Sequence, residues 1–220
     1  SVKTAEKGIL LMHENLKAGM TEEELWSILH KTNIENGGEW FETRLLNSGS
    51  KTNPWFQECS SRIIQKGDLV AFDTDMIGPY GYCADISRTF VEGRKLSNYQ
   101  NKIHSLAYEN VKYNERLIKP GVSFREFAEK AWQLPDNCFD NHYPCQIHGV
   151  GMSDEWPFIA YPNEDYSNGD YSGAFEENMV VCVESYIGEV GGNEGAKLED
   201  QYLVTDKGLK LLSSIPLNLV

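Results

Sequence analysis

Three aspartates in the first half of the chain have the spacing of metal ligands. The strand-like run Phe-Asp-Thr-Asp places Asp73 and Asp75 on one face of a β-strand, because successive side chains of a strand alternate between faces. A Gly-Pro-Tyr-Gly turn and a second strand follow, so residues 68–91 read as a hairpin in which Asp85 faces the first two aspartates. Three carboxylates on one half-buried face are unfavourable unless a cation joins them. The hairpin therefore indicates a metal ion, with the neighbouring Arg88 as the alternative cation.

Three further candidate ligands lie in the second half of the chain. His148 precedes a Gly-Val-Gly run, which lets the backbone approach another group closely. Glu184 and Glu199 each interrupt an otherwise apolar strand pattern, where an acidic side chain is unusual. Oxygen and imidazole ligands in this number suit two divalent ions such as iron, manganese, zinc or cobalt. The sequence therefore predicts a metal cage made of Asp73, Asp75, Asp85, His148, Glu184 and Glu199.

The sequence contains two similar helical units, one before each of the two groups of candidate ligands. Residues 4–18 read as an amphipathic helix, and Thr21 with Glu24 forms the capping-box pattern that begins a second helix. The pattern recurs 102 residues later, where Ser123 and Glu126 follow another helical stretch. The repeat favours two halves of similar fold, although capping boxes are common enough to coincide by chance.

Strand patterns dominate the segments that carry the remaining ligands. Residues 178–187 and 197–205 form a pair of strand candidates joined by a glycine-rich turn. Residues 135–173 are rich in aromatic residues, proline, asparagine and aspartate, and we expect mostly irregular loops there. Helices beside antiparallel hairpins predict an α+β fold, in a single domain over 1–220.

Composition narrows the range of partners. The chain has 220 residues and a formal net charge of -13, so a nucleic-acid backbone, which needs clustered Lys and Arg, is an unsuitable partner. No apolar run approaches the ~20 residues of a membrane helix, and the N-terminal residues lack the apolar segment of a signal peptide. The five cysteines are odd in number and lack CxxC spacing, which argues against a disulfide framework and structural zinc. We therefore expect a cytoplasmic protein that binds neither nucleic acid nor membrane.

Four strings of residues, in this order, resemble the pita-bread metalloenzymes, a family that includes methionine aminopeptidase, aminopeptidase P, prolidase and creatinase. They are Gly-Tyr-Cys-Ala-Asp-Ile-Ser-Arg-Thr-Phe over 81–90, His-Gly-Val-Gly over 148–151, Asn-Met-Val-Val-Cys-Val-Glu over 178–184 and Lys-Leu-Glu-Asp-Gln-Tyr-Leu-Val-Thr over 197–205. The resemblance implies a pita-bread fold, with pseudo-twofold halves and a curved antiparallel sheet covered by helices. It also implies a small-molecule substrate, a homodimer, and a catalytic domain that forms the C-terminal part of a longer chain.

The chain departs from the peptidases of this family at three places. The peptidases have two aspartate ligands eleven positions apart, whereas the residue eleven positions before Asp85 is Thr74. Their His-Glu-x-Pro string, whose histidine assists the tetrahedral intermediate, reads Asp-Glu-Trp-Pro here, with Asp154 in place of the histidine. Their further histidine before the first aspartate strand has no counterpart in the loop over 47–58. A carboxylate accepts rather than donates hydrogen bonds at neutral pH, so these departures argue against ordinary peptide hydrolysis.

One branch of the family resembles the chain more closely, the pita-bread type of dimethylsulfoniopropionate (DMSP) lyase. It shares the Asp-x-Asp hairpin, the Asn-Pro-Trp-Phe-Gln-Glu loop and the aspartate after the His-Gly-x-Gly run. The resemblance implies cleavage of DMSP to dimethyl sulfide and acrylate, with Asp154 as the base. A cationic sulfonium suits aromatic walls. The candidate substrate contacts are Tyr143 foremost, then Trp55, Phe56 and Trp156, for which core packing is the alternative.

Two other functions stay open beside the lyase. The first is a metallopeptidase that hydrolyses Xaa-Pro bonds or another small amide, against which Asp154 and the missing histidines argue. The second is a non-catalytic pita-bread module that binds protein. Such modules lose metal ligands, whereas this chain has the full predicted set.

Overall fold

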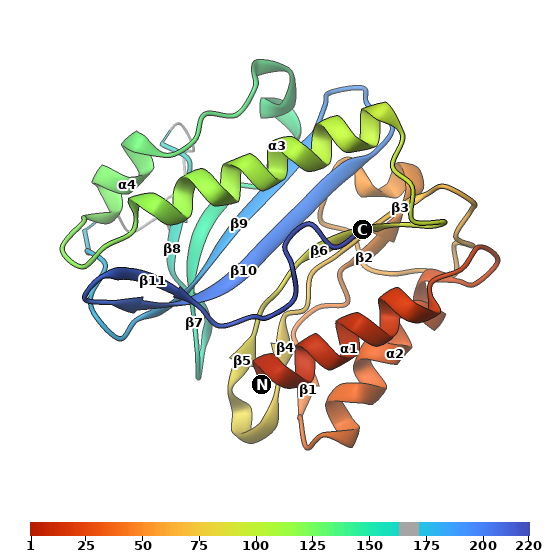
Figure 1. The fold of residues 1–220 in the computed structure, drawn as a ribbon, viewed down its shortest axis with the longest axis horizontal. Helices are drawn as coiled ribbons and strands as arrows, with labels where there is room; N and C mark the ends of the chain where they lie inside the picture. Colours follow the sequence, from red (N-terminus) through yellow and green to blue (C-terminus); the bar gives the residue numbers. More distant parts are fainter. Residues whose placement is uncertain (163–171) are drawn as a thin grey trace.

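Two helices lie side by side at the start of the computed structural model, which describes residues 1–162 and 172–220 (Figure 1). They are α1 (Val2–Asn15) and α2 (Glu22–Glu35). The predicted capping box begins α2, because Thr21 accepts a hydrogen bond from the Glu24 amide and the Glu24 carboxylate accepts one from the Thr21 amide. Apolar residues of both helices are buried in one core with residues of the strands that follow.

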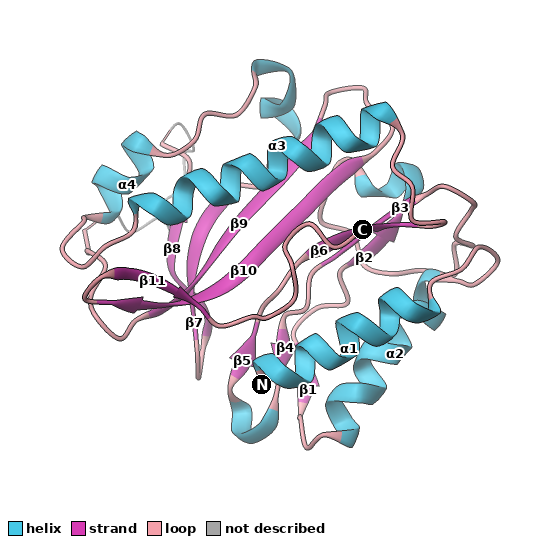
Figure 2. Ribbon diagram, viewed as in Figure 1, coloured by secondary structure: helices cyan, strands magenta, loops and turns pink. Residues whose placement is uncertain are grey.

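Six short strands next to these helices form two small antiparallel sheets (Figure 2). The first sheet has the order β2-β3-β6 and contains β2 (Leu46–Ser48), β3 (Leu69–Phe72) and β6 (Arg88–Val91). The second has the order β1-β4-β5 and contains β1 (Trp40–Phe41), β4 (Met76–Ile77) and β5 (Cys83–Ala84). The predicted hairpin therefore passes from one sheet into the other and back.

A five-stranded antiparallel sheet, with the helix α3 (Asn98–Asn114) lying across it, forms most of the second half (Figure 1). In sheet order its strands are β11 (Gly208–Leu211), β10 (Gly195–Thr205), β9 (Val180–Gly188), β7 (Cys145–Val150) and β8 (Asp154–Ala160). The helix α4 (Phe124–Lys130) begins at Ser123, whose side chain accepts a hydrogen bond from the Glu126 amide. The other half of the predicted capping box does not form among the described residues, since the Glu126 carboxylate accepts from Lys130 instead. Short 3-10 helices lie at Gly49–Thr52, Pro79–Gly81, Glu115–Leu117 and Asp136–Asn141. The β9 and β10 strands confirm the strand pair predicted from the sequence.

The prediction of one continuous strand through Asp73 and Asp75 is wrong. β3 ends at residue 72 and β4 begins at residue 76, and Asp75 has a φ of 34°, outside the β region. Between them the Thr74 hydroxyl replaces the ladder, since it donates to the Ala84 carbonyl and accepts from the Ile86 amide, both at 2.9 Å. The break between the two sheets, and not strand alternation, places both carboxylates on the same side.

The prediction of mostly irregular structure over 135–173 is also wrong in its central part. That segment contains β7 and β8, which pair with register shifts on both sides of His148. The bulges, a proline inside β8 and the many polar residues hide the period-two pattern that normally reveals a strand. Residues 163–171 of the segment lie outside the described residues.

In the described ranges, none of the helices has the length and apolar character needed to cross a bilayer.

Candidate metal centre and aromatic pocket

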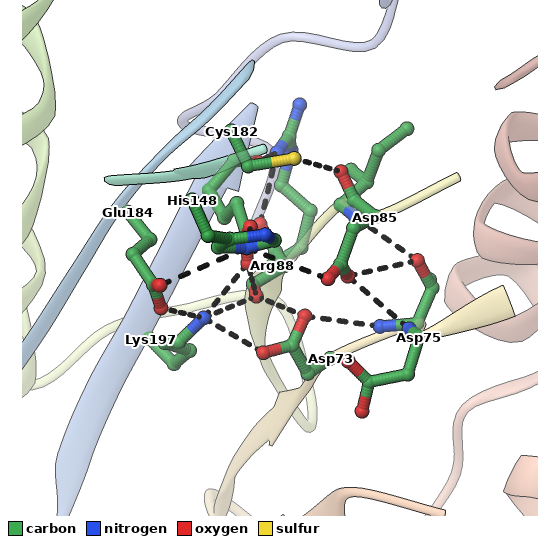
Figure 3. Close-up of polar contacts among 12 residues, drawn as sticks. Asp73, Asp75, Asp85, Arg88, His148, Cys182, Glu184 and Lys197 are labelled. Carbon is green, nitrogen blue, oxygen red and sulfur yellow. Dashed lines mark hydrogen bonds and ion pairs between the residues drawn. The ribbon is translucent and has the colours of Figure 1, made fainter. Parts of the chain in front are cut away.

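The six predicted ligands converge on one buried site from both halves of the chain. Figure 3 labels all of them except Glu199. Asp73 and Asp75 come from the break between β3 and β4, and Asp85 from the break between β5 and β6. His148 lies in β7, while Glu184 in β9 and Glu199 in β10 are direct partners in the ladder that joins those strands. The exposed fractions of the six residues range from 0% to 8%. The tertiary structure thus brings together the whole set that the sequence singled out.

His148 directs one ring nitrogen at the acids of the cage. Its Nε2 lies 2.9 Å from Glu199 Oε1, 3.7 Å from Asp85 Oδ2 and 3.7 Å from Glu184 Oε1. Burial alone would lower the pKa of His148, but the acidic groups around it, among them Asp154 and Glu199, raise that pKa well above its ordinary value. This nitrogen is the one placed to act as a metal ligand.

The glycine after His148 has a structural purpose. A Cβ at Gly149 would collide with the carbonyl of Trp156 and come within 2.7 Å of Pro157. The close approach expected from the glycine run is therefore that of β8 to β7. Because β8 carries Asp154 at its start, this contact sets that residue against the cage.

A lysine that the sequence analysis did not single out occupies the centre of the cage. Lys197 Nζ lies 2.7 Å from Asp73 Oδ2 and 2.8 Å from both Glu184 Oε2 and Glu199 Oε2, and it donates to Ser87 Oγ at 2.9 Å. Its side chain is fully buried. The sequence feature that could have revealed Lys197 is its position two residues before Glu199, which puts both side chains on one face of β10.

Arg88, the alternative cation proposed for the hairpin, points elsewhere. Its guanidinium binds Asp200 Oδ1 at 2.7 Å and donates to the backbone carbonyls of Glu199, Ile215 and Pro216. It ties β6 to β10 and to the C-terminal segment. Among the described residues, Lys197 is therefore the basic side chain that offsets the cage carboxylates, and the suggestion that Arg88 does so is wrong.

Negative charge exceeds positive charge in this site. Burial, with the charge of Asp73, raises the pKa of Asp75 to about 8, and burial, with the charge of Glu199, raises that of Glu184 to about 8. Burial and the same neighbours hold the pKa of Asp85 well above its usual range. Burial opposes ionisation of Glu199 too, but Lys197 and His148 outweigh it and keep the pKa of Glu199 well below normal. In the part of the chain that the structure describes, one ammonium group and one imidazolium leave the other acids of the cage short of cations.

The donor set fits a divalent metal ion. Carboxylate oxygens of Asp73, Asp85 and Glu199 lie within 4.8 Å of one another. Glu184 Oε1 is buried without a hydrogen-bond partner in the described part of the chain. An orphaned carboxylate oxygen among hard oxygen and nitrogen ligands is the environment that divalent ions such as manganese, iron or zinc occupy.

Asp154 lies at the edge of the cage with one free oxygen. Its Oδ1 is 3.3 Å from His148 Nδ1 and accepts a hydrogen bond from the Glu155 amide at 3.1 Å. Its side chain is only 2% exposed, and Oδ2 has no hydrogen-bond partner among the described residues. A carboxylate that is fixed by contacts to one oxygen, and whose other oxygen makes no hydrogen bond to the described residues, can accept a proton from a group placed beside it.

An aromatic pocket of about 650 Å³ opens next to the cage. All four predicted aromatic residues line it: Trp55, Phe56, Tyr143 and Trp156. Phe56 stacks on Tyr143 with ring centroids 5.7 Å apart, and the Tyr143 ring lies 5.5 Å from Lys197 Nζ, so this tyrosine joins the pocket to the cage. Trp55 also stacks on Tyr186 and is 7% exposed, whereas Phe56 and Trp156 are more than half exposed. Core packing therefore accounts for much of the surface of Trp55, and Tyr143 packs against the same core cluster.

Comparison with known proteins assigns the family. Residues 1–206 match metallopeptidase family M24. The chain belongs to this family. The M24 chain is also similar in fold to the prolidase of Pyrococcus horikoshii, with a TM-score of 0.84 and 25% identity over 100% of this chain and 61% of that chain. The α+β pita-bread fold predicted from the sequence is thereby confirmed.

Two curated relatives of this M24 chain carry the same name, dimethylsulfoniopropionate lyase DddP. The protein from Roseovarius nubinhibens is 46% identical over 198 residues, which cover 89% of this chain and 44% of that protein. The protein from Roseobacter denitrificans is 42% identical over 197 residues, with the same coverage of 89% and 44%. The chain therefore spans less than half the length of these two relatives.

Proposed function

We propose that this chain is the catalytic domain of a metal-dependent lyase that cleaves DMSP to dimethyl sulfide and acrylate. The observation that carries the proposal is Asp154 Oδ2, a buried oxygen at the edge of the cage that has no hydrogen-bond partner in the described ranges. The similarity to two DMSP lyases supports the choice of substrate. We further propose the cage of Asp73, Asp75, Asp85, His148, Glu184 and Glu199 as the ligands of two divalent ions.

The reaction needs a base, an anchor for a carboxylate and a site for a cation. Bound divalent ions would hold the substrate carboxylate and acidify the hydrogen on its α-carbon. Asp154 Oδ2 accepts that proton, and His148 holds the other oxygen of Asp154 in place. The electrons of the broken C–H bond form the double bond of acrylate, while the C–S bond breaks and its electron pair stays on sulfur. The aromatic faces of the pocket bind the sulfonium group before this step.

A dipeptidase acting on Xaa-Pro substrates is the second candidate, because a prolidase shares the fold. Asp154 is the observation against it. A peptidase needs a donor to the oxyanion of its tetrahedral intermediate, and an ionised carboxylate beside that oxyanion would repel it. The homodimer and the cytoplasmic location remain predictions from the sequence.

The test is a headspace assay for dimethyl sulfide with the metal-loaded protein. We expect sulfide release from the wild type and a loss of roughly 10²- to 10⁴-fold in the Asp154→Asn variant, with unchanged metal content, because only the base is removed. Glu42→Gln is the matched control, since exposed Glu42 lies near enough to feel the charge of Asp154 but is not a pocket residue. Cleavage of an Xaa-Pro dipeptide without any sulfide release would overturn the proposal in favour of the peptidase.

A further inference from the structure

One acidic side chain of the aromatic pocket has no role in the reaction described above. Glu155 follows Asp154 in β8 and lines the cavity together with Phe56, Tyr143 and Trp156. Its backbone φ of 65° lies in the left-handed region that residues other than glycine rarely adopt. Such conformations persist only where the surrounding structure holds them, and they cluster at ligand sites. The chain keeps an unfavourable backbone conformation at the residue that brings a carboxylate to the pocket wall.

The Glu155 carboxylate is not one of the acids that Lys197 binds. Within residues 1–162 and 172–220 it makes no hydrogen bond or ion pair, whereas Lys197 contacts three acids of the cage. One of its oxygens lies within 4.8 Å of carboxylate oxygens of Asp75 and Asp85, which places it between the cage and the aromatic walls.

We propose that Glu155 is the residue that selects a cationic substrate, by placing its carboxylate beside the sulfonium group while the substrate carboxylate lies in the cage. The inference rests on the proposed function, since it requires a substrate with a carboxylate at one end and a cation at the other. Aromatic faces attract such a cation weakly and with little direction. A carboxylate in a partly buried site adds a stronger attraction that water screens less than at the surface.

The same contact helps the product to leave. When the C–S bond breaks, the positive charge disappears, and dimethyl sulfide is neutral. The product therefore loses its attraction to Glu155 and to the rings of Tyr143 and Trp156. Because the attraction does not grow on the way to the transition state, it lowers KM without raising kcat. A base would behave in the opposite way, since its removal lowers kcat.

Binding of two inert analogues separates charge from shape. The first carries a trimethylammonium group in place of dimethylsulfonium, and the second carries an isosteric, neutral tert-butyl group. Both are titrated by calorimetry into the metal-loaded wild type, Glu155→Gln, Glu155→Asp and Glu42→Gln. We expect Glu155→Gln to weaken the cationic analogue about 10-fold or more and to leave the neutral one within about threefold. Glu155→Asp keeps the charge and should preserve most of the preference, and Glu42→Gln should preserve all of it.

Activity and metal content complete the test. With DMSP as substrate, Glu155→Gln should raise KM about 10-fold and change kcat by less than about threefold. An unchanged preference for the cationic analogue in Glu155→Gln would overturn the inference, as would loss of metal from that variant, which would make Glu155 a ligand. A wild type that releases no dimethyl sulfide would contradict the proposed function itself, so the two failures are distinguishable.

Discussion

At the scale of single residues, the acids of the cage depend on the ammonium group of Lys197. It contacts Asp73, Glu184 and Glu199 at 2.7 to 2.8 Å with no exposure to solvent. Replacing it by methionine removes the ammonium group that these three carboxylates share in the metal-free protein, where removal of one partner from a buried ion pair costs about 3–5 kcal/mol. We expect Lys197→Met to lower the free energy of unfolding by that amount without metal and by clearly less with manganese present. Denaturant unfolding with and without a chelator measures both values.

The matched control for that substitution is Lys31→Met. Lys31 forms an ion pair with Glu35 along α2, but their side chains are 73% and 59% exposed. Exposed pairs contribute about 0–1 kcal/mol, so this variant should unfold almost like the wild type in both conditions. An equal loss of stability with and without metal in Lys197→Met would show that the lysine acts through the packing of its chain and not through charge.

At the scale of the elements, Arg88 joins three segments that are distant in sequence. From β6 it binds Asp200 of β10 at 2.7 Å and donates to the carbonyls of Ile215 and Pro216 in the C-terminal segment. Its removal would leave the buried Asp200 carboxylate and several carbonyls without their donor. We expect Arg88→Met to lower the free energy of unfolding by about 3–5 kcal/mol, measured by urea denaturation.

Arg44→Met is the comparison for this prediction. Arg44 pairs with Glu58 at 2.7 Å, as close as the Arg88 pair, but the two side chains are 49% and 50% exposed. Solvent screening limits such a pair to about 1 kcal/mol at most. Equal effects of the two substitutions would mean that burial of Arg88 adds nothing to the attachment of the C-terminal segment.

At the scale of the whole molecule, metal binding and stability should be linked through pH. In the metal-free fold the pKa values of Asp75 and Glu184 are raised to about 8, well above their values in an unfolded chain. The folded state therefore binds more protons than the unfolded state between about pH 4 and 8, and the metal-free protein loses stability as the pH rises through this window. Divalent ions bind the deprotonated carboxylates, so they should add more stability at pH 8 than at pH 6.

Unfolding midpoints with manganese and with a chelator, at pH 6 and at pH 8, check this linkage. The difference between the two conditions should grow with pH in the wild type. Asp85→Asn lacks one predicted ligand and should respond weakly to the chelator at either pH. A chelator effect of the same size at both pH values would show that Asp75 and Glu184 do not titrate on metal binding.

The sequence by itself determined the features that are encoded locally. Thr21 and Glu24 by themselves predict a capping box. The apolar runs around Glu184 and Glu199 predict strands, whatever those strands pack against in the fold. The types of the candidate ligands follow from chemistry alone, because carboxylates in apolar strands need a cation. Four strings in the family's order were enough to predict the pita-bread fold.

Only the tertiary structure decided which charges meet. Lys197 and Asp73 are 124 residues apart, and no local pattern shows that the Lys197 ammonium group enters the cage while the guanidinium of Arg88, nearer in sequence, does not. The break that aims Asp75 depends on the Thr74 hydroxyl bridging two strands, and a period-two pattern cannot show it. In the sequence, Glu155 looks like an ordinary surface acid. The structure places it, as part of β8, in the wall of the aromatic pocket. The periodicity of apolar and polar residues predicts which face of a helix or strand a side chain occupies. Which side chains it contacts depends on distant segments packing together, and that periodicity does not show it.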